Sequence, residues 1–189
     1  MTNKFSVIYD ACVLYPAPLR DLLMYLALTD LFKAHWTDRI HEEWIHALVS
    51  KQGRDRKVLE KIRDLMDAHV RDAKVTGHEY LIDTLTLPDP NDRHVLAAAI
   101  KSNANAIVTL NLKDFPTAYL AEFDIEVIHP DDFITYQLDL APTTVCRALK
   151  LQRESLKNPP KTAEEFLATL QKQQLPQTVH ALREYADFI

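Results

Sequence analysis

The sequence predicts an α/β fold with a central parallel sheet, helices on both of its faces, and a helical C-terminal extension. An apolar strand-like run at residues 4–9 opens the chain, helical and strand patterns alternate between residues 90 and 128, and strand signals vanish after about residue 141. The 189 residues, 47% of them hydrophobic, fit one core of ordinary size with a small appendage. We therefore expect a main domain over residues 1–140 and an extension over 141–189.

The individual elements follow from periodicity and helix-start signals. We predict strands at about 4–9, 106–109 and 125–128, and helices at about 18–33, 38–50, 54–69 and from Pro90 onward. Pro90 suits the first position of its helix, where a missing N–H costs nothing. After residue 141, prolines divide three short helical patterns, and Thr162 with Glu165 forms a capping box for the second.

Composition excludes several classes of function. With 2 Gly, the chain cannot contain a glycine-rich phosphate loop of either common type. The chain has two cysteines, Cys12 and Cys146, and they lack a zinc-ligand spacing, so we expect a reducing, cytoplasmic setting. His41 and His46 are five residues apart, which does not fit the helical motif of a zinc protease. No apolar run approaches the roughly 18 residues of a membrane span, and no secretion signal is visible. A net charge of -5 argues against broad attraction to nucleic acid but allows a nuclease whose acids form its own site.

Acidic residues stand at the ends of the predicted elements. Asp10 follows the first strand, Asp92 opens a helix, Glu43 lies on the helix at 38–50, and Asp114 follows the strand at 106–109. Ligands bind beyond the carboxyl ends of parallel strands, so acids at these ends converge. Oxygen ligands of this kind suit Mg²⁺ or Mn²⁺, which predicts a metal-dependent enzyme acting on phosphate esters.

Each acid also has a purely structural interpretation. Asp10 equally suits a turn before Pro16. For Asp89 the role of N-cap is favoured, whereas Asp92, in the first helical turn, reaches the rim that holds Asp10 and is favoured for the metal site. Glu43 lies at the edge of an apolar stripe, and its neighbour Glu42 is expected to face solvent; for an isolated helix, both would simply complement the dipole.

Together these motifs resemble a PIN-domain nuclease, most closely the VapC-type toxins of bacterial toxin-antitoxin pairs. The resemblance covers about residues 4–135 and is carried by Asp10, by Glu43, by Asp92 in Asp-Arg-His-Val-Leu-Ala-Ala-Ala, and by the segment from Ile107 to Pro116. It implies an α/β sandwich and an endoribonuclease that cleaves single-stranded RNA with Mg²⁺ or Mn²⁺. It also implies a cognate antitoxin partner and leaves a homodimer open.

One position departs from the family pattern. Where such enzymes commonly carry an Asp two residues after the strand-ending Thr109, this chain has Asn111, and Asp114 follows three residues later. The resemblance therefore assigns the metal-binding and catalytic roles to Asp10, Glu43, Asp92 and Asp114, with Thr109 and Asn111 in support. Thr109 is also an ordinary β-branched strand residue.

Phosphate groups of RNA need cationic partners. The candidates are Arg54, Arg56 and Lys57, in the charged connection between two helices, and Arg93. A charged connection is more often merely solvated, and the histidines are expected at surface or boundary positions. Two rival functions remain. One is a HAD-type phosphatase, which is disfavoured because Cys12 occupies the place of its second Asp; the other is a PIN-fold module that binds RNA or protein without catalysis.

Overall fold

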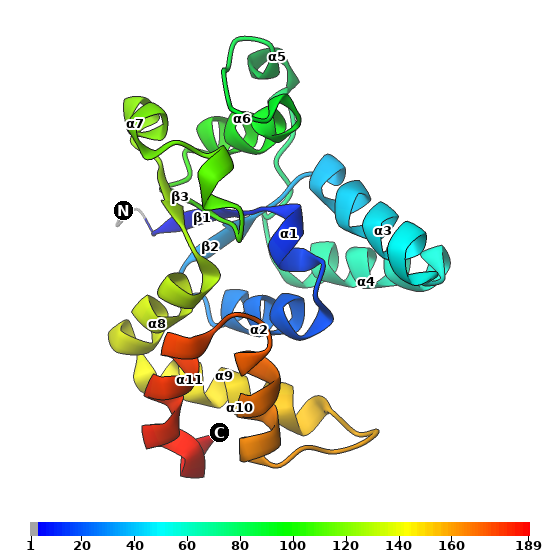
Figure 1. The fold of residues 1–189 in the computed structure, drawn as a ribbon, viewed down its shortest axis with the longest axis vertical. Coiled ribbons are helices and arrows are strands. Elements are labelled where there is room, and N and C mark those ends of the chain that lie inside the picture. The colour runs from blue at the N-terminus through cyan, green and yellow to red at the C-terminus, as the bar shows by residue number, and fades with distance from the viewer. Residues whose placement is uncertain (1–3) are drawn as a thin grey trace. The chain divides into compact units, whose positions relative to one another are not determined.

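A computed structural model describes residues 4–189 and divides into two compact units. The first comprises the chain up to Tyr15 together with Phe32–His129, and the second comprises Pro16–Leu31 together with Pro130–Ile189. The elements of both units are drawn in Figure 1. The domain boundary expected at residue 140 stays a prediction, and the contacts divide the chain at residue 130.

The first unit is an α/β unit. Its elements are β1 (Ser6–Tyr9), α1 (Ala11–Leu14), β2 (Lys33–His35), α3 (Asp38–Gln52), α4 (Arg56–His69), α5 (Glu79–Ile82), η1 (Pro90–Asp92), α6 (Arg93–Ser102), β3 (Ala106–Val108), η2 (Leu112–Asp114), α7 (Thr117–Leu120), η3 (Ala121–Phe123) and β4 (Glu126–Ile128). The three predicted strands and the helices at 38–50, 54–69 and after Pro90 are confirmed.

The sheet of this unit is parallel throughout, in the order β2-β1-β3-β4. All residues of β1 and β3 are buried, as expected for strands covered on both faces. Tyr9 pairs with Val108, so Asp10 and Thr109 leave the sheet side by side at the carboxyl ends of neighbouring strands. The α/β fold with a central parallel sheet is therefore confirmed.

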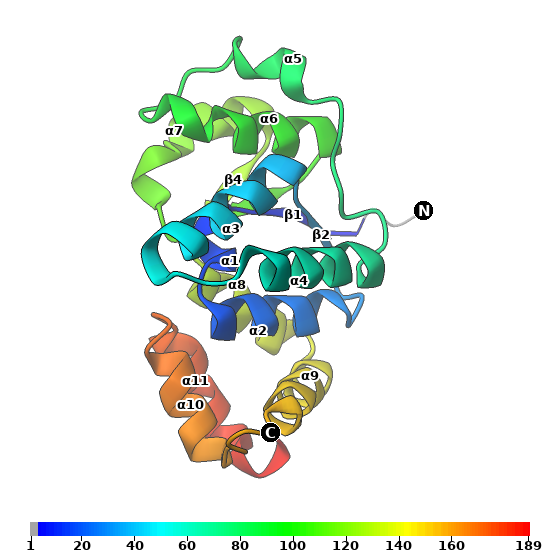
Figure 2. The same cartoon turned by 90° about the vertical axis from the view of Figure 1, so that its right-hand side faces the viewer.

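Helices are arranged around this sheet within the first unit. Helix α6 packs against β1 and β3, and α5 packs on α6. Helices α3 and α4 lie side by side in both ribbon views (Figures 1 and 2). The turn between them is closed by Gly53, whose φ of 61° is one that glycine adopts readily. Helix α3 also packs against α1, which brings Glu43 toward the segment that follows Asp10.

The helix predicted at 18–33 is too long, and strand β2 was missed. Helix α2 ends at Ala27, and Asp30 takes a left-handed φ of 65°. The apolar pair Leu31 and Phe32 continues the helical pattern in the sequence, although Phe32 precedes a strand in the structure. Periodicity alone cannot detect a three-residue strand that is specified by its pairing with β1.

The second unit is helical. It contains α2 (Ala17–Ala27), α8 (Pro130–Leu140), α9 (Pro142–Ser155), α10 (Ala163–Gln171), α11 (Pro176–Leu182) and η4 (Arg183–Phe188). The predicted capping box is confirmed, because the backbone N–H of Thr162 donates to Glu165 Oε2 at 2.9 Å and the Glu165 N–H donates to Thr162 Oγ1 at 3.2 Å. Among residues 4–189, no helix is long and apolar enough to cross a membrane.

Candidate active site

Asp10 and Thr109 form the centre of the candidate site. Asp10 is buried, and its Oδ2 accepts a hydrogen bond of 2.7 Å from the Thr109 hydroxyl. The Thr109 oxygen in turn accepts from the backbone N–H of Asn111 at 3.0 Å. Thr109 thus fixes the rotamer of Asp10 and ties it to the segment that carries Asn111 and Asp114.

Cys12 is a second partner of Asp10 that the sequence did not reveal as part of the site. Its thiol donates to Asp10 Oδ2 at 3.0 Å and accepts from the Leu110 N–H at 3.2 Å. Burial, followed by the negative charge of Asp10, raises the pKa of this thiol far above its usual range. Cys12 therefore serves as a hydrogen-bond donor to Asp10.

Asp89 and Asp92 have different environments: Asp89 precedes η1, whereas Asp92 ends η1 and directly precedes α6. Asp89 Oδ1 accepts from the Asn91 N–H at 2.8 Å, which confirms its role as a cap. Asp92 Oδ2 is buried and has no hydrogen-bond partner within the described residues.

The pKa of Asp92 reports how the carboxylates converge. It is raised to about 7, first by burial and then by the negative charges of Asp10, Asp89, Asp114 and Glu43. Burial disfavours the charged form of Asp92, and the neighbouring carboxylates add to that effect because they share the same poorly solvated region. Each of the three other acids that the sequence predicted for the site therefore contributes to the raised pKa of Asp92.

Glu43 projects from α3 toward this region and contacts the side chains of Arg39 and His94. Arg39 Nε donates to Glu43 Oε1 at 3.3 Å, and His94 Nε2 lies 2.8 Å from the same oxygen. The His94 contact is close but lacks hydrogen-bond geometry. Glu42 points elsewhere, as expected, and is bound by Arg56 in an exposed ion pair.

Asn111 directly precedes η2, Asp114 is the last residue of η2, and their side chains bind each other. The Asn111 side-chain amide donates to Asp114 Oδ2, so the two side chains act as a unit at the carboxyl end of β3. The neutral Asn111 thereby holds the acid that follows it in the sequence.

The comparisons with known proteins place this chain in a family. The family model of the PIN domain matches residues 6–113, more than half of the 189 residues. This chain belongs to the PIN domain family. The VapC50 C-terminal domain matches residues 130–184. Both matches confirm the resemblance to VapC-type PIN proteins.

A curated relative agrees with this assignment. A protein of Mycobacterium tuberculosis (strain ATCC 25618 / H37Rv), described as "Putative ribonuclease VapC50", is 42% identical over 86 residues. The match covers 46% of this chain and 50% of the relative, so it spans half the relative's length. No solved structure matches the chain.

The donors of this PIN domain fit a hard divalent cation in their chemistry. They are carboxylate oxygens, one of them is the buried, unpartnered Oδ2 of Asp92, and their mutual repulsion is what a cation relieves. Within residues 4–189, however, no three His, Cys, Asp or Glu side chains are arranged closely enough to form a metal-binding group. The assignment of Asp10, Glu43, Asp92 and Asp114 as ligands therefore stays a prediction.

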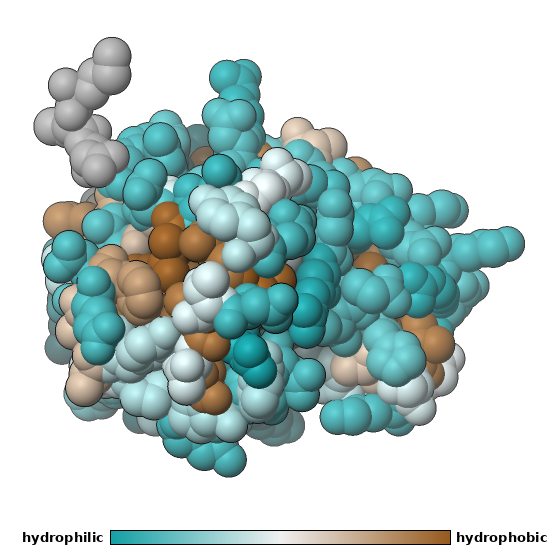
Figure 3. Space-filling view, turned by 90° about the horizontal axis from the view of Figure 1, so that it is seen from above, coloured by the Kyte–Doolittle hydropathy of each residue, from teal (hydrophilic) through white to brown (hydrophobic). Residues whose placement is uncertain are grey.

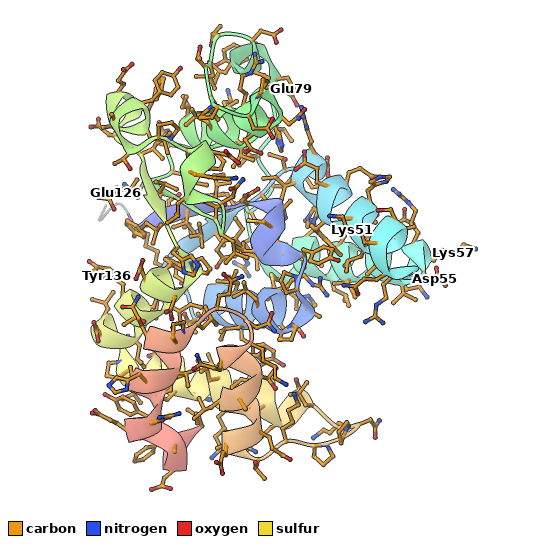
Figure 4. All side chains as sticks on the ribbon, in the orientation of Figure 1. Lys51, Asp55, Lys57, Glu79, Glu126 and Tyr136 are labelled. Atoms are coloured by element: carbon orange, nitrogen blue, oxygen red, sulfur yellow. The ribbon has the colours of Figure 1, made fainter. Side chains whose placement is uncertain are left out.

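The basic candidates of the PIN domain lie at different places. Arg54 and Lys57 are exposed where α3 meets α4. Figure 4 labels Lys57 at this end of the helix pair. Arg56 binds Glu42 and Glu60 of its own chain at 2.6 and 2.9 Å, which makes it a weaker candidate for RNA phosphate. Arg93, partly buried, directly follows Asp92. Seen from above in Figure 3, the α3–α4 pair at the right presents a mainly hydrophilic surface.

The expectation that the histidines lie at surface or boundary positions is wrong for His41, His78 and His94, which are buried. His41 Nδ1 accepts from Trp44 Nε1 at 3.0 Å, while its Nε2 lies 3.0 Å from Asp67 Oδ1 and so carries the proton. The bond to Asp67 joins α3 to α4. The local sequence gives no signal for it, because Asp67 lies 26 residues after His41.

Proposed function

We propose that this protein is a metal-dependent endoribonuclease that cleaves single-stranded RNA in the cytoplasm and acts as the toxin of a toxin-antitoxin pair. The observation that carries the proposal is the convergence of acids at the carboxyl ends of β1 and β3, where the pKa of Asp92 is raised to about 7. Membership of the PIN domain family and the match to the VapC50 C-terminal domain support it.

Asp10, Glu43, Asp92 and Asp114 would hold Mg²⁺ or Mn²⁺. When bound, such a cation stabilises negative charge on phosphate oxygens and makes a bound water more acidic. The protein's part is positioning. Thr109 and Cys12 orient Asp10, Arg39 holds Glu43, and Asn111 holds Asp114.

A PIN-fold module without catalysis is the second candidate. One observation favours it: Asn111 stands where the family pattern has an acid, and its amide occupies an oxygen of Asp114. Such a module would bind RNA or protein without cutting. The phosphatase alternative has no comparable support, because the Cys12 thiol at the place of a second Asp is neutral.

A toxin needs an inhibitor, and the acidic site offers a place for one. An antitoxin segment that inserts an Arg or Lys among the carboxylates would neutralise them, while an amphipathic helix covers adjoining apolar surface. We expect such a partner to be encoded beside this gene as a small DNA-binding protein.

Growth of a bacterial host tests this proposal. Expression of the wild-type chain alone should arrest growth, and co-expression of the neighbouring small protein should restore it. Asp10→Asn should be harmless without a partner, whereas Asp83→Asn, at the exposed acid that follows α5, should arrest growth like the wild type. Equal growth with wild type and Asp10→Asn at matched soluble levels would favour a housekeeping nuclease or the non-catalytic module.

A further inference from the structure

A cavity of about 310 Å³ opens between α1 and α3 beside the candidate active site. Its lining is mostly apolar and includes Cys12, Tyr15, Trp44 and Ala47, with Glu43 and Lys51 as charged members. The volume is at the lower end of the range for small-molecule sites, so it suits a single planar group rather than a large ligand.

Two lining residues join the cavity directly to the candidate active site. Cys12 lines the cavity while its thiol is bonded to Asp10 Oδ2. Glu43 lines it while its charge contributes to the raised pKa of Asp92. A ligand in the cavity would therefore be a neighbour of whatever the carboxylates hold.

The α3 wall carries an acid at one end and a base at the other. Glu43, Ala47 and Lys51 are spaced four residues apart, so they form one stripe along the helix. Eight residues of helix correspond to about 12 Å between Glu43 and Lys51. Lys51 is exposed and is labelled on α3 in Figure 4. The two ends can thus contact different phosphate groups of one strand, the acid through a cation and the lysine directly.

The α1 wall supplies an aromatic ring in a fixed position. Gln52 Nε2 donates to the Tyr15 hydroxyl at 3.0 Å, which ties Tyr15 to the end of α3. An aromatic ring held in this way loses little rotamer freedom when a base stacks on it, and stacking is how single-stranded nucleic acid is commonly bound.

We propose that this cavity is a nucleotide subsite for the RNA substrate, in which a base packs between Tyr15 and the Ala47 face of α3 and Lys51 binds a neighbouring phosphate. This assignment rests on the proposed ribonuclease function. A nucleotide matches all three features of the cavity: the adjoining acidic site, the apolar middle with one ring, and the basic end. An aliphatic side chain of a partner protein would leave Lys51 unused.

The first test fills the cavity without touching the carboxylates. Ala47→Leu should weaken binding of a fluorescein-labelled single-stranded RNA octamer about tenfold, the loss of one stacked base. Binding is measured by anisotropy in an Asp10→Asn background so that the RNA stays intact. His46→Leu, a neighbouring exposed position on α3, is the matched control and should bind as the parent does.

Abasic positions introduced one at a time into the octamer identify the base concerned. The parent should lose affinity at one position, and the Ala47→Leu variant should be insensitive there. Lys51→Gln should reduce the slope of log Kd against log salt by about 0.7, the value for one phosphate contact in a single strand. Lys61→Gln, on the exposed side of α4, should leave the slope unchanged.

Equal Kd values for Ala47→Leu and its parent, with the variant folded, would overturn the subsite. So would an Ala47→Leu variant that keeps its RNA affinity but escapes inhibition by a partner protein, because the cavity would then belong to that partner. A different result would contradict the nuclease proposal. If the wild-type protein binds RNA through the cavity but does not cut it, the subsite is retained and the catalytic function is rejected.

Discussion

At the scale of single residues, Asp92 has a carboxyl group whose charged form is disfavoured in the folded protein. Its Oδ2 is buried without a partner, and its pKa is raised to about 7 by burial and neighbouring acids. In the unfolded chain, the same group titrates near 3.8.

This difference in pKa predicts the direction in which the stability of the fold changes with pH. Between about pH 4 and 7, the folded protein keeps a proton that the unfolded chain has lost, so Asp92 makes stability fall as pH rises through this window. Asp92→Asn removes that slope. In EDTA, the variant should melt above the wild type at pH 7.5 and equal it near pH 3.5. A variant that melts below the wild type at pH 7.5 would show that Asp92 stabilises the fold.

Thr109 gives a second prediction at this scale. Thr109→Val keeps the shape of the buried strand end but removes the hydrogen bond to Asp10. Groups that orient ligands typically contribute 10- to 100-fold to metal affinity or activity, so a Mn²⁺ titration should show about a tenfold weaker Kd. Thr109→Ser, which retains the hydroxyl, should restore most of the affinity. Identical Mn²⁺ binding by the Val variant would remove Thr109 from the site.

At the scale of elements, the two acids before α6 are expected to have separate roles. Asp89 is a cap, and Asp92 is a predicted metal ligand. Asp89 accepts from the Asn91 N–H, so Asp89→Ala should cost about 0.5–2 kcal/mol of unfolding free energy, measured by urea denaturation. Asp89→Asn caps equally well and should retain both stability and RNA cleavage. Loss of cleavage by a fully stable Asp89→Asn variant would make Asp89 a ligand instead of a cap.

Local sequence patterns predict the placement of some of the site residues but not of others. The strand-ending positions of Asp10 and Thr109 follow from apolar runs, and parallel pairing then places them together. The contact of Glu43 with His94 could not be predicted, because it depends on how α3 and α6 are placed around the sheet. The sequence holds a weak signal for His94: it directly precedes the apolar run from Val95 to Ile100, and in the structure residues 94–99 are all buried.

At the scale of the whole molecule, the sequence predicts the fold class, but it does not predict how the segments group into two units. The parallel sheet and the helical C-terminal region follow from periodicity, whereas the grouping of α2 with α8–α11 depends on contacts between distant segments. Asp131 is an example. This buried carboxylate accepts from the backbone N–H groups of Gln177 and Thr178, 46 and 47 residues later, and so caps the start of α11.

The cation itself is tested by thermal unfolding. A ligand that binds only the folded state at 100 times its Kd stabilises that state by about 2.7 kcal/mol. Mg²⁺ or Mn²⁺ should therefore raise the Tm of the wild type and of Asp83→Asn, and EDTA should reverse the rise. The Asp10→Asn protein should respond much less. Tightly held zinc in the purified protein would contradict the oxygen-ligand site.

Cleavage of single-stranded RNA by purified protein tests the central claim most directly. The wild type should cut a mixed-sequence RNA in Mg²⁺ or Mn²⁺, and EDTA should abolish the cleavage. Asp10→Asn and Asp92→Asn should reduce it to background while their circular dichroism and melting remain those of a folded protein. RNA cleavage by wild type and both variants at equal rates, or its persistence in EDTA, would contradict the account.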